Sequence, residues 1–140
     1  MSIKQLNPYL MFNGTAEQAI QLYERALGAK TEGPMRFGDV PGATIAPEHR
    51  RRVMHARLTL AAGVIMISDT HPDTPVATES NVHVCLHFDD LADMTAKFEA
   101  LARGGTVTMA VHDTFWGAKF GTITDAFGVR WMFNYQIDHT

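Results

Sequence analysis

Three donor side chains alternate along one short stretch of the sequence. His83, Cys85 and His87 lie in the segment NVHVCLHF, each two residues from the next, a spacing that places side chains on one face of a β-strand. Imidazole and thiolate are common metal ligands. Along an extended strand, however, His83 and His87 are about 13 Å apart, so only a neighbouring pair could share an ion, with further ligands from other strands. We therefore expect structural histidines here, and no feature nearby marks Cys85 as a nucleophile.

A second group of polar residues follows the apolar run VIMI. Ser68, Asp69 and His71 place a hydroxyl, a carboxylate and an imidazole at one strand end, where binding residues often gather. The segment Ser-Asp-Thr-His-Pro is also ordinary turn chemistry. Both interpretations, a binding site and a turn, stay open, and the turn is favoured.

Length and composition restrict the class of protein. The chain has 140 residues, 46% of them hydrophobic, and a formal net charge of −3, which indicates one ordinary globular domain without attraction to nucleic acid or anionic membranes. The basic run Arg50-Arg51-Arg52 is expected to be a solvated loop, because a nucleic-acid site needs a broader basic face. The single cysteine excludes an internal disulfide framework, and no secretory signal or membrane-length apolar run is present, so we expect a cytoplasmic protein.

Two segments have the periodicity of helices. In TAEQAIQLYERALGAK, Thr15 and Gln18 are placed as a capping box and Gly28 as the terminator. In DDLADMTAKFEALARGG, Asp89 or Asp90 can cap the helix and Gly104 can end it. The apolar stripes are Ala16, Ala19, Ile20, Tyr23, Ala26 and Leu27 in the first segment, and Leu91, Met94, Phe98 and Leu101 in the second.

The remaining sequence alternates, or runs apolar, in lengths typical of strands. The predicted strands are residues 7–12, 35–38, 53–61, 64–68, 82–88, 107–112, 120–124 and 129–135. The order is therefore strand, helix and three strands, given twice, with helix-ending glycines Gly28 and Gly104 in matching places. We predict an α+β fold in which two tandem βαβββ units form a cupped mixed sheet. One domain would span 1–140, with a first unit at 5–70, a linker at 71–80 and a second unit at 81–137.

Alternation also assigns the side chains of the strands to faces. In VMHARLTLA the apolar residues Met54, Ala56, Leu58 and Leu60 suit helix packing, which leaves His55, Arg57 and Thr59 on the opposite face. In the second unit His83, Cys85 and His87 oppose the apolar set. Each unit has one helix to cover one face of its sheet, so the other face must line a cavity or meet a partner.

The segments LYERALGAK, HARLTLAAGVIMISD and FWGAKFGTITDAFGVRWMFN, in this order of elements, resemble the vicinal oxygen chelate superfamily, the glyoxalase and bleomycin-resistance fold, and more specifically its PhnB-like branch. The resemblance implies that DAFG forms the hairpin turn between the last two strands. It also implies that Gly117 and Gly121 let the chain bend closely past the sheet. Phe115 and Trp116 would then cap the mouth of the cup, or else fill a core or a dimer interface.

The resemblance also locates the metal-ligand positions of the glyoxalase I type. Alignment through the helix and strand motifs places them on Pro8, Met66, His83 and Met132. Three of the four are proline or methionine, and one histidine gives a divalent ion no anionic ligand. We therefore expect no metal and no cofactor.

The leading functional prediction is a metal-independent, PhnB-like small-molecule binder, cytoplasmic and homodimeric, of no assigned reaction. Arg57 or His55 would meet an anionic group of the ligand, and Trp116 a planar one. The predicted ligand-binding residues are Phe12, His55, Arg57, Ser68, Asp69, His83, Phe115, Trp116 and Asn134.

Three alternatives follow from the same resemblance. One is a metal-dependent lyase or dioxygenase, in which a metal polarises substrate oxygens. Another is an antibiotic-sequestering resistance protein. Such proteins usually have an acidic, aromatic groove, and the expected cup has few acidic residues. A demethylubiquinone methyltransferase, a label carried by some relatives, is disfavoured because no glycine-rich loop follows a strand and opens a helix.

Overall fold

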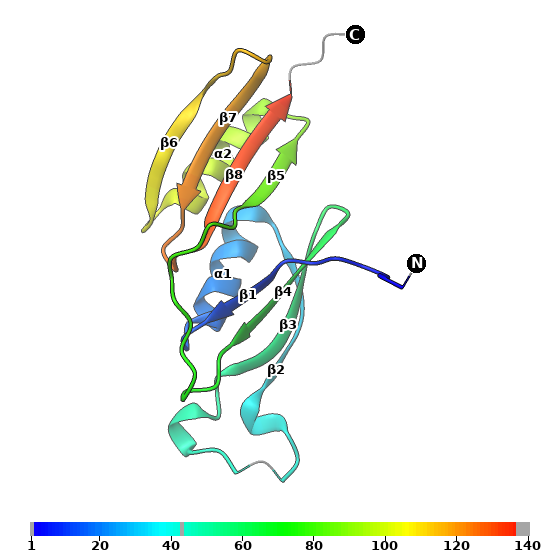
Figure 1. The fold of residues 1–140 in the computed structure, drawn as a ribbon, viewed down its shortest axis with the longest axis vertical. Helices are drawn as coiled ribbons and strands as arrows, with labels where there is room; N and C mark the ends of the chain where they lie inside the picture. The colour runs from blue at the N-terminus through cyan, green and yellow to red at the C-terminus, as the bar shows by residue number, and fades with distance from the viewer. Residues whose placement is uncertain (1, 43, 137–140) are drawn as a thin grey trace. The chain divides into compact units, whose positions relative to one another are not determined.

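The computed structural model describes residues 2–42 and 44–136. The chain divides into two compact units, Met1–Val76 and Ala77–Thr140, and each is a βαβββ unit (Figure 1). Unit 1 consists of β1 (Tyr9–Phe12), α1 (Ala16–Leu27), β2 (Lys30–Arg36), β3 (Val53–Leu60) and β4 (Gly63–Asp69), with short 3-10 turns at Phe37–Asp39 and Pro47–His49 between β2 and β3. Unit 2 consists of β5 (Val84–Phe88), α2 (Leu91–Ala102), β6 (Thr106–Asp113), β7 (Ala118–Thr124) and β8 (Arg130–Gln136).

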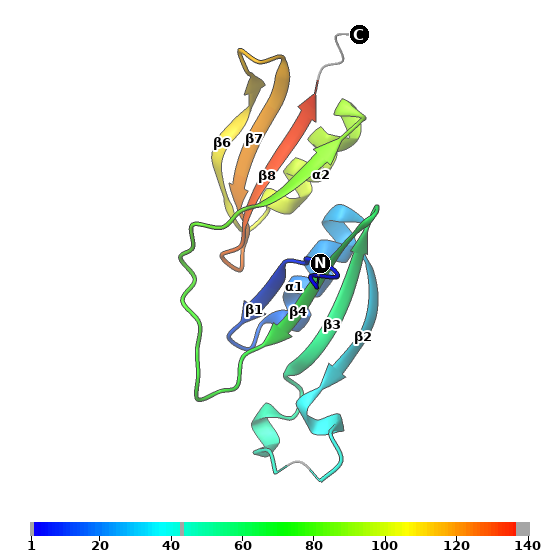
Figure 2. The same cartoon turned by 45° about the vertical axis from the view of Figure 1, so that its right-hand side comes forward.

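Each unit contains one mixed, four-stranded sheet. The strand orders are β1-β4-β3-β2 and β5-β8-β7-β6, with β1 parallel to β4, β5 parallel to β8 and the other neighbours antiparallel. In each unit the helix lies along one face of its own sheet (Figure 2). The predicted α+β class and the repeated βαβββ order are therefore confirmed, as two mixed sheets with one in each unit.

The second strand was predicted in the wrong place. The sequence indicated residues 35–38, whereas β2 begins at Lys30, almost directly after α1. Gly33 and Pro34 lie within β2 and argue against a central strand, but β2 is an edge strand, where proline is tolerated. The register with β3 shifts at this point, between Glu32 and Met35, so the glycine and proline occupy an irregularity rather than a ladder position.

The helix α1 begins with a capping arrangement that the sequence did not predict. Thr15 makes no side-chain capping bond, so the predicted Thr15–Gln18 capping box is wrong. Instead Asp69, at the end of β4, accepts hydrogen bonds from the backbone N–H groups of Gly14 and Ala16 at 2.8 and 3.0 Å. The other end agrees with the sequence, because Gly28 adopts the left-handed conformation, with φ of 73°.

The core of unit 1 lies between α1 and the sheet. The apolar stripe predicted for α1 is buried throughout. On β3 the buried residues are Val53, Ala56 and Leu58, whereas Met54 is only half-buried. The prediction for Met54 was wrong because the register shifts between Met35 and Arg36, which exchanges the face taken by residues 53 and 54.

The core of unit 2 is built from larger side chains. Met94, Phe98 and Leu101 of α2 are buried, together with Trp131 and Phe133 of β8. Asp90 caps α2 by accepting a hydrogen bond from Asp93 N at 3.0 Å, as predicted. Gly121 lets α2 approach the sheet, because a Cβ atom there would lie 2.9 Å from Phe98 Cε2.

The predicted hairpin turn at Asp125–Gly128 is present. Gly128 N donates to Asp125 O at 3.1 Å, and Gly128 has a φ of 92°. The buried Asp125 carboxylate accepts from Phe127 N, Val129 N and the Trp131 indole nitrogen at 2.9, 3.0 and 2.9 Å. A single side chain therefore orders the turn and fixes the largest residue of the core.

Candidate functional site

The candidate binding surfaces are the sheet faces that lie opposite the helix of the same unit, which we call the open faces. On β4 of unit 1, Ile65 and Ile67 point toward the α1 side and are buried, so alternation places Met66 and Ser68 on the open face. Register then adds Arg57, which pairs with Met66, and Tyr9, which pairs with the same residue from the other side. His55 shares the face of Arg57 by alternation.

The predicted site residues divide between these surfaces and other places. His55, Arg57 and Ser68 share the open face of unit 1, and of the three only Ser68 is buried. Phe12 and Asp69 are paired in register and buried on the α1 side of the same sheet. Because these two side chains are buried on the helix side, they do not lie on the open face where the predicted ligand would bind.

Asp69 has a structural role that accounts for its position. Besides the two N–H groups at the start of α1, its second carboxylate oxygen accepts from Val53 N at 2.9 Å. These partners lie far from Asp69 in sequence, so the local sequence does not reveal them. This is why a turn was the favoured interpretation of the Ser-Asp-Thr-His segment. His71 is exposed and lies 3.6 Å from Asp73, whereas Asp69 is buried.

In unit 2 the predicted residues are also dispersed. His83 precedes β5 and is exposed, whereas Asn134 lies on β8 between Phe133, which is buried, and Tyr135, which is half-buried. Phe115 and Trp116 lie in the turn between β6 and β7, 97% and 52% exposed, with their ring centroids 5.1 Å apart. Neither aromatic side chain belongs to the core of the unit.

The open face of unit 1 carries a loosely paired arginine. Arg57 Nε lies 4.0 Å from Glu32 Oε2, and the two side chains are 44% and 73% exposed. Tyr9 Oη lies 3.1 Å from His55 Nδ1, and the Ser68 hydroxyl donates to Met11 Sδ at 3.1 Å. The face therefore joins one cation, one imidazole and one phenol.

Tyr9 and Glu32 were missed by sequence reasoning. The segment NPYLMF is apolar on both alternating positions, so its pattern does not reveal which residues point away from α1. Glu32 lies in the part of β2 that precedes the predicted strand at 35–38. Only the register of β1 with β4 and of β2 with β3 supplies the missing information.

The basic segment at Arg50–Arg52 is largely committed to the chain itself. Arg50 donates to Gly38 O at 2.8 Å and Arg52 to Thr70 O at 2.8 Å. Arg51 is 81% exposed and only 3.9 Å from Glu17. Two of the three guanidinium groups therefore anchor the chain around β3, and the third has the solvated character that the sequence predicts.

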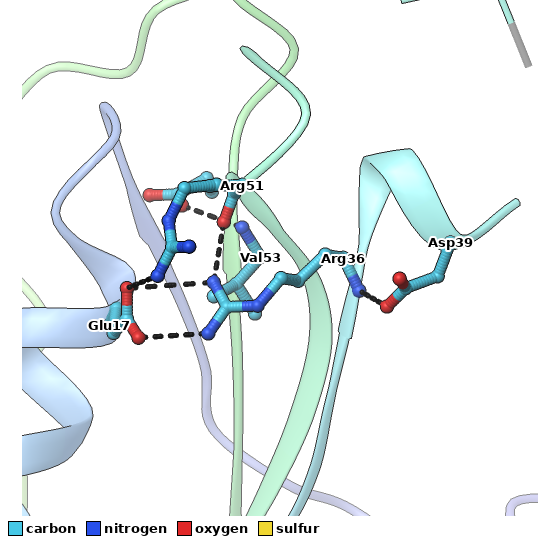
Figure 3. Close-up of polar contacts among 6 residues, drawn as sticks. Glu17, Arg36, Asp39, Arg51 and Val53 are labelled. Carbon is cyan, nitrogen blue, oxygen red and sulfur yellow. Dashed lines mark hydrogen bonds and ion pairs between the residues drawn. The ribbon is translucent and has the colours of Figure 1, made fainter. Parts of the chain in front are cut away.

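Glu17 of α1 is the centre of a small ionic network in the same region (Figure 3). Arg36 donates to both its carboxylate oxygens, at 2.8 and 3.5 Å, and also to Arg51 O at 2.6 Å. The hydrogen bond from Arg36 holds the pKa of Glu17 below its ordinary value. This network joins α1 to the end of β2 and to the chain entering β3.

The metal positions implied by the glyoxalase I resemblance do not supply a fitting donor set. Pro8 and His83 each precede their strand, and the strand residues in register with Met66 and Met132 are Tyr9 and Cys85. A phenol, a thiol and two thioethers are poor ligands for a hard divalent ion. Among residues 2–42 and 44–136, no group of three or more His, Cys, Asp or Glu side chains is placed to hold a metal.

These features define a protein with two glyoxalase-type βαβββ units. Residues 5–133 match the Glyoxalase/Bleomycin resistance protein/Dioxygenase superfamily, and the chain belongs to that family. The predicted superfamily is therefore confirmed. Within the described part of the chain, no helix is both long and apolar enough to cross a membrane.

Similar proteins agree with this assignment. Protein YjdN of Escherichia coli (strain K12) is 35% identical over 138 residues, which cover 92% of this chain and 93% of YjdN. The crystal structure of protein PA1353 from Pseudomonas aeruginosa is 40% identical with a TM-score of 0.87, covering 97% of this chain and 100% of that one.

The fold is also shared with a Bacillus cereus structure described as a putative 3-demethylubiquinone-9 3-methyltransferase, PhnB protein. That structure is 23% identical with a TM-score of 0.69, covering 94% of this chain and 99% of the other. At this identity the likeness shows the fold alone. The predicted homodimer and the predicted cytoplasmic location stay predictions.

Proposed function

We propose that this chain binds a small anionic molecule on the open face of unit 1, without the divalent metal of the glyoxalase type. The observation that carries the proposal is the position of Arg57. Its guanidinium group lies on a sheet face beside His55 and is 44% exposed, with a carboxylate partner only at 4.0 Å. An arginine with free donors is suited to bidentate recognition of a carboxylate or a phosphate.

The contact with Glu32 is weak enough to be exchanged for a ligand. Glu32 is 73% exposed, and its distance from Arg57 is at the limit for an ion pair. Exposed pairs of this kind contribute about 0–1 kcal/mol. A ligand anion that forms two short hydrogen bonds to Arg57 can therefore displace Glu32 at little cost. Until it is displaced, the negative charge of Glu32 repels an approaching anion.

His55 and Tyr9 add polar groups next to the arginine. If the Tyr9 hydroxyl donates to His55 Nδ1, 3.1 Å away, the imidazole carries its proton on Nε2 and has one donor left. This arrangement needs no charge on the imidazole. It favours a ligand that has a second acceptor group near its anionic one.

The test is a binding comparison of matched variants by isothermal titration. Inorganic phosphate, succinate, citrate and aromatic carboxylates serve as the probes. Arg57→Ala should weaken every anion that binds the wild type by tenfold or more, and Glu32→Gln should strengthen binding. Arg51→Ala is the control, because it removes an equally positive, more exposed side chain outside the open face.

Two outcomes would contradict the proposal. One is equal affinity of wild type and Arg57→Ala for every anion that binds. The other is an equal loss in Arg57→Ala and Arg51→Ala, which would show a general charge effect rather than a site.

A further inference from the structure

Three donor side chains lie on the open face of unit 2, a thiol, an imidazole and a thioether. Cys85 and His87 are two residues apart on β5 and both exposed, so they point to the same side of the strand. Met132 of β8 is paired in register with Cys85. Its neighbours Trp131 and Phe133 are buried, which places the Met132 side chain on the same open face.

The distance between the first two donors suits a shared ion. Cys85 Sγ lies 3.6 Å from His87 Nε2. If an ion lay about 2.3 Å from the thiolate sulfur and about 2.05 Å from the imidazole nitrogen, the sulfur–ion–nitrogen angle would be about 110°. This angle lies between the tetrahedral and trigonal values. Neighbouring strands are about 4.8 Å apart, so the flexible Met132 side chain can bring its sulfur to the third position.

We propose that Cys85, His87 and Met132 form a binding site for a single copper(I) ion. Thiolate, thioether and imidazole are the ligands that copper(I) prefers, and the set contains no carboxylate. Zinc sites take three or four ligands from Cys, His, Asp and Glu, and no such group of three occurs in the described part of the chain. The donor chemistry therefore favours the soft monovalent ion.

Asn134 controls which imidazole nitrogen is available. Asn134 Nδ2 lies 3.2 Å from His87 Nδ1, which places the imidazole proton on Nε2, toward Cys85. Turning the amide by half a rotation presents Oδ1 to Nδ1–H, and the Nε2 lone pair is then free for the ion. Binding also releases the thiol proton of Cys85 to solvent as the copper–sulfur bond forms.

The equivalent positions of unit 1 do not reproduce this set. Tyr9 occupies the place of Cys85, and Met66 that of Met132. Met66 therefore provides a matched control, since it is a methionine at the same register position without a thiol beside it.

The experiment is a titration of the full chain with copper(I) under anaerobic, reducing conditions, with bicinchoninate as the competing chelator. The wild type should bind one copper per chain, with the ultraviolet charge-transfer band of a copper–thiolate bond. Cys85 is the only cysteine in the chain, so Cys85→Ser should abolish both. His87→Ala and Met132→Leu should each weaken binding at least tenfold, and Met66→Leu should bind like the wild type.

Several results would overturn the proposal. One is retention of a stoichiometric copper ion by Cys85→Ser. Another is wild-type affinity in either His87→Ala or Met132→Leu, which would indicate a bare thiol rather than a built site. Arg57→Ala should bind copper normally, so failure of the anion proposal and failure of this one are distinguishable.

Discussion

The two units share a backbone plan but carry different chemistry on their open faces. Both have a 12-residue helix on one side of a four-stranded mixed sheet with the same strand order. The open face of unit 1 has an arginine, an imidazole and a phenol, whereas that of unit 2 has a thiol, an imidazole and a thioether. The buried helix side therefore keeps the same plan in both units, while the opposite face carries different side chains in each.

The units also differ in how the helix is held at its N-terminus. In unit 2 the capping residue is Asp90, adjacent to α2 in sequence. In unit 1 it is Asp69, which comes from β4 and also holds Val53. Unit 1 therefore depends on one buried carboxylate for three long-range contacts, and unit 2 on a local one.

The largest expected effect is that of removing this carboxylate. Asp69→Ala leaves three backbone N–H groups without their acceptor, two of them buried and one half-buried, and each buried group left unsatisfied costs about 1–3 kcal/mol. We expect a loss of at least about 3 kcal/mol in the free energy of unfolding, measured by urea denaturation. Asp69→Asn keeps one acceptor oxygen and should lose less. A loss below about 1 kcal/mol for Asp69→Ala would show that unit 1 does not depend on it.

A smaller loss in the free energy of unfolding is expected for Gly121→Ala, at a position where the two units have side chains of different volume. Gly121 of β7 has Ala56 as its counterpart on β3, since these residues pair with Phe133 and Ile67 in matching register. Gly121→Ala would place a methyl group 2.9 Å from Phe98 and 3.0 Å from Val111, and overpacking costs about 1–3 kcal/mol. In urea denaturation, the double variant Gly121→Ala/Phe98→Leu should have a higher free energy of unfolding than Phe98→Leu alone. An unchanged stability of Gly121→Ala would mean that α2 moves away freely.

The local cap of unit 2 should matter less. Asp90→Ala removes one capping bond at an exposed helix end, which costs about 1 kcal/mol. Asp90→Ser, which retains a capping oxygen, is the matched control and should stay near the wild type in the same urea measurement. If Asp90→Ala were as damaging as Asp69→Ala, the contrast between long-range and local anchoring would be wrong.

The smallest effect concerns pH. The pKa of Glu17 is lowered in the folded state by its hydrogen bond from Arg36, so its stabilising contribution is present above the unfolded pKa of about 4.3 and is lost as pH falls through the folded value. Glu17→Gln should therefore lower the free energy of unfolding by up to about 1 kcal/mol at pH 7, typical of an ion pair that solvent still reaches. Denaturation at pH 3 should show a smaller difference from the wild type. A difference that stays constant from pH 7 to pH 3 would contradict this assignment.

The sequence predicted most of the fold but only part of the candidate site. Apolar periodicity and terminal glycines are local signals, so both helices and most strands were placed within a few residues. β2 was misplaced because a glycine and a proline interrupt its pattern, and edge position is a property of the sheet. The roles of Tyr9 and Asp69 depend on partners more than 40 residues away, which no local pattern reveals.

The central claim is that the open faces differ in chemistry and that unit 1 takes the anion. An NMR titration of isotopically labelled protein with the tightest-binding anion of the screen tests it most directly. The largest backbone shifts should fall on β3 and β4, around Arg57, and vanish in Arg57→Ala. Shifts centred on β5 and β8, unchanged in that variant, would contradict it.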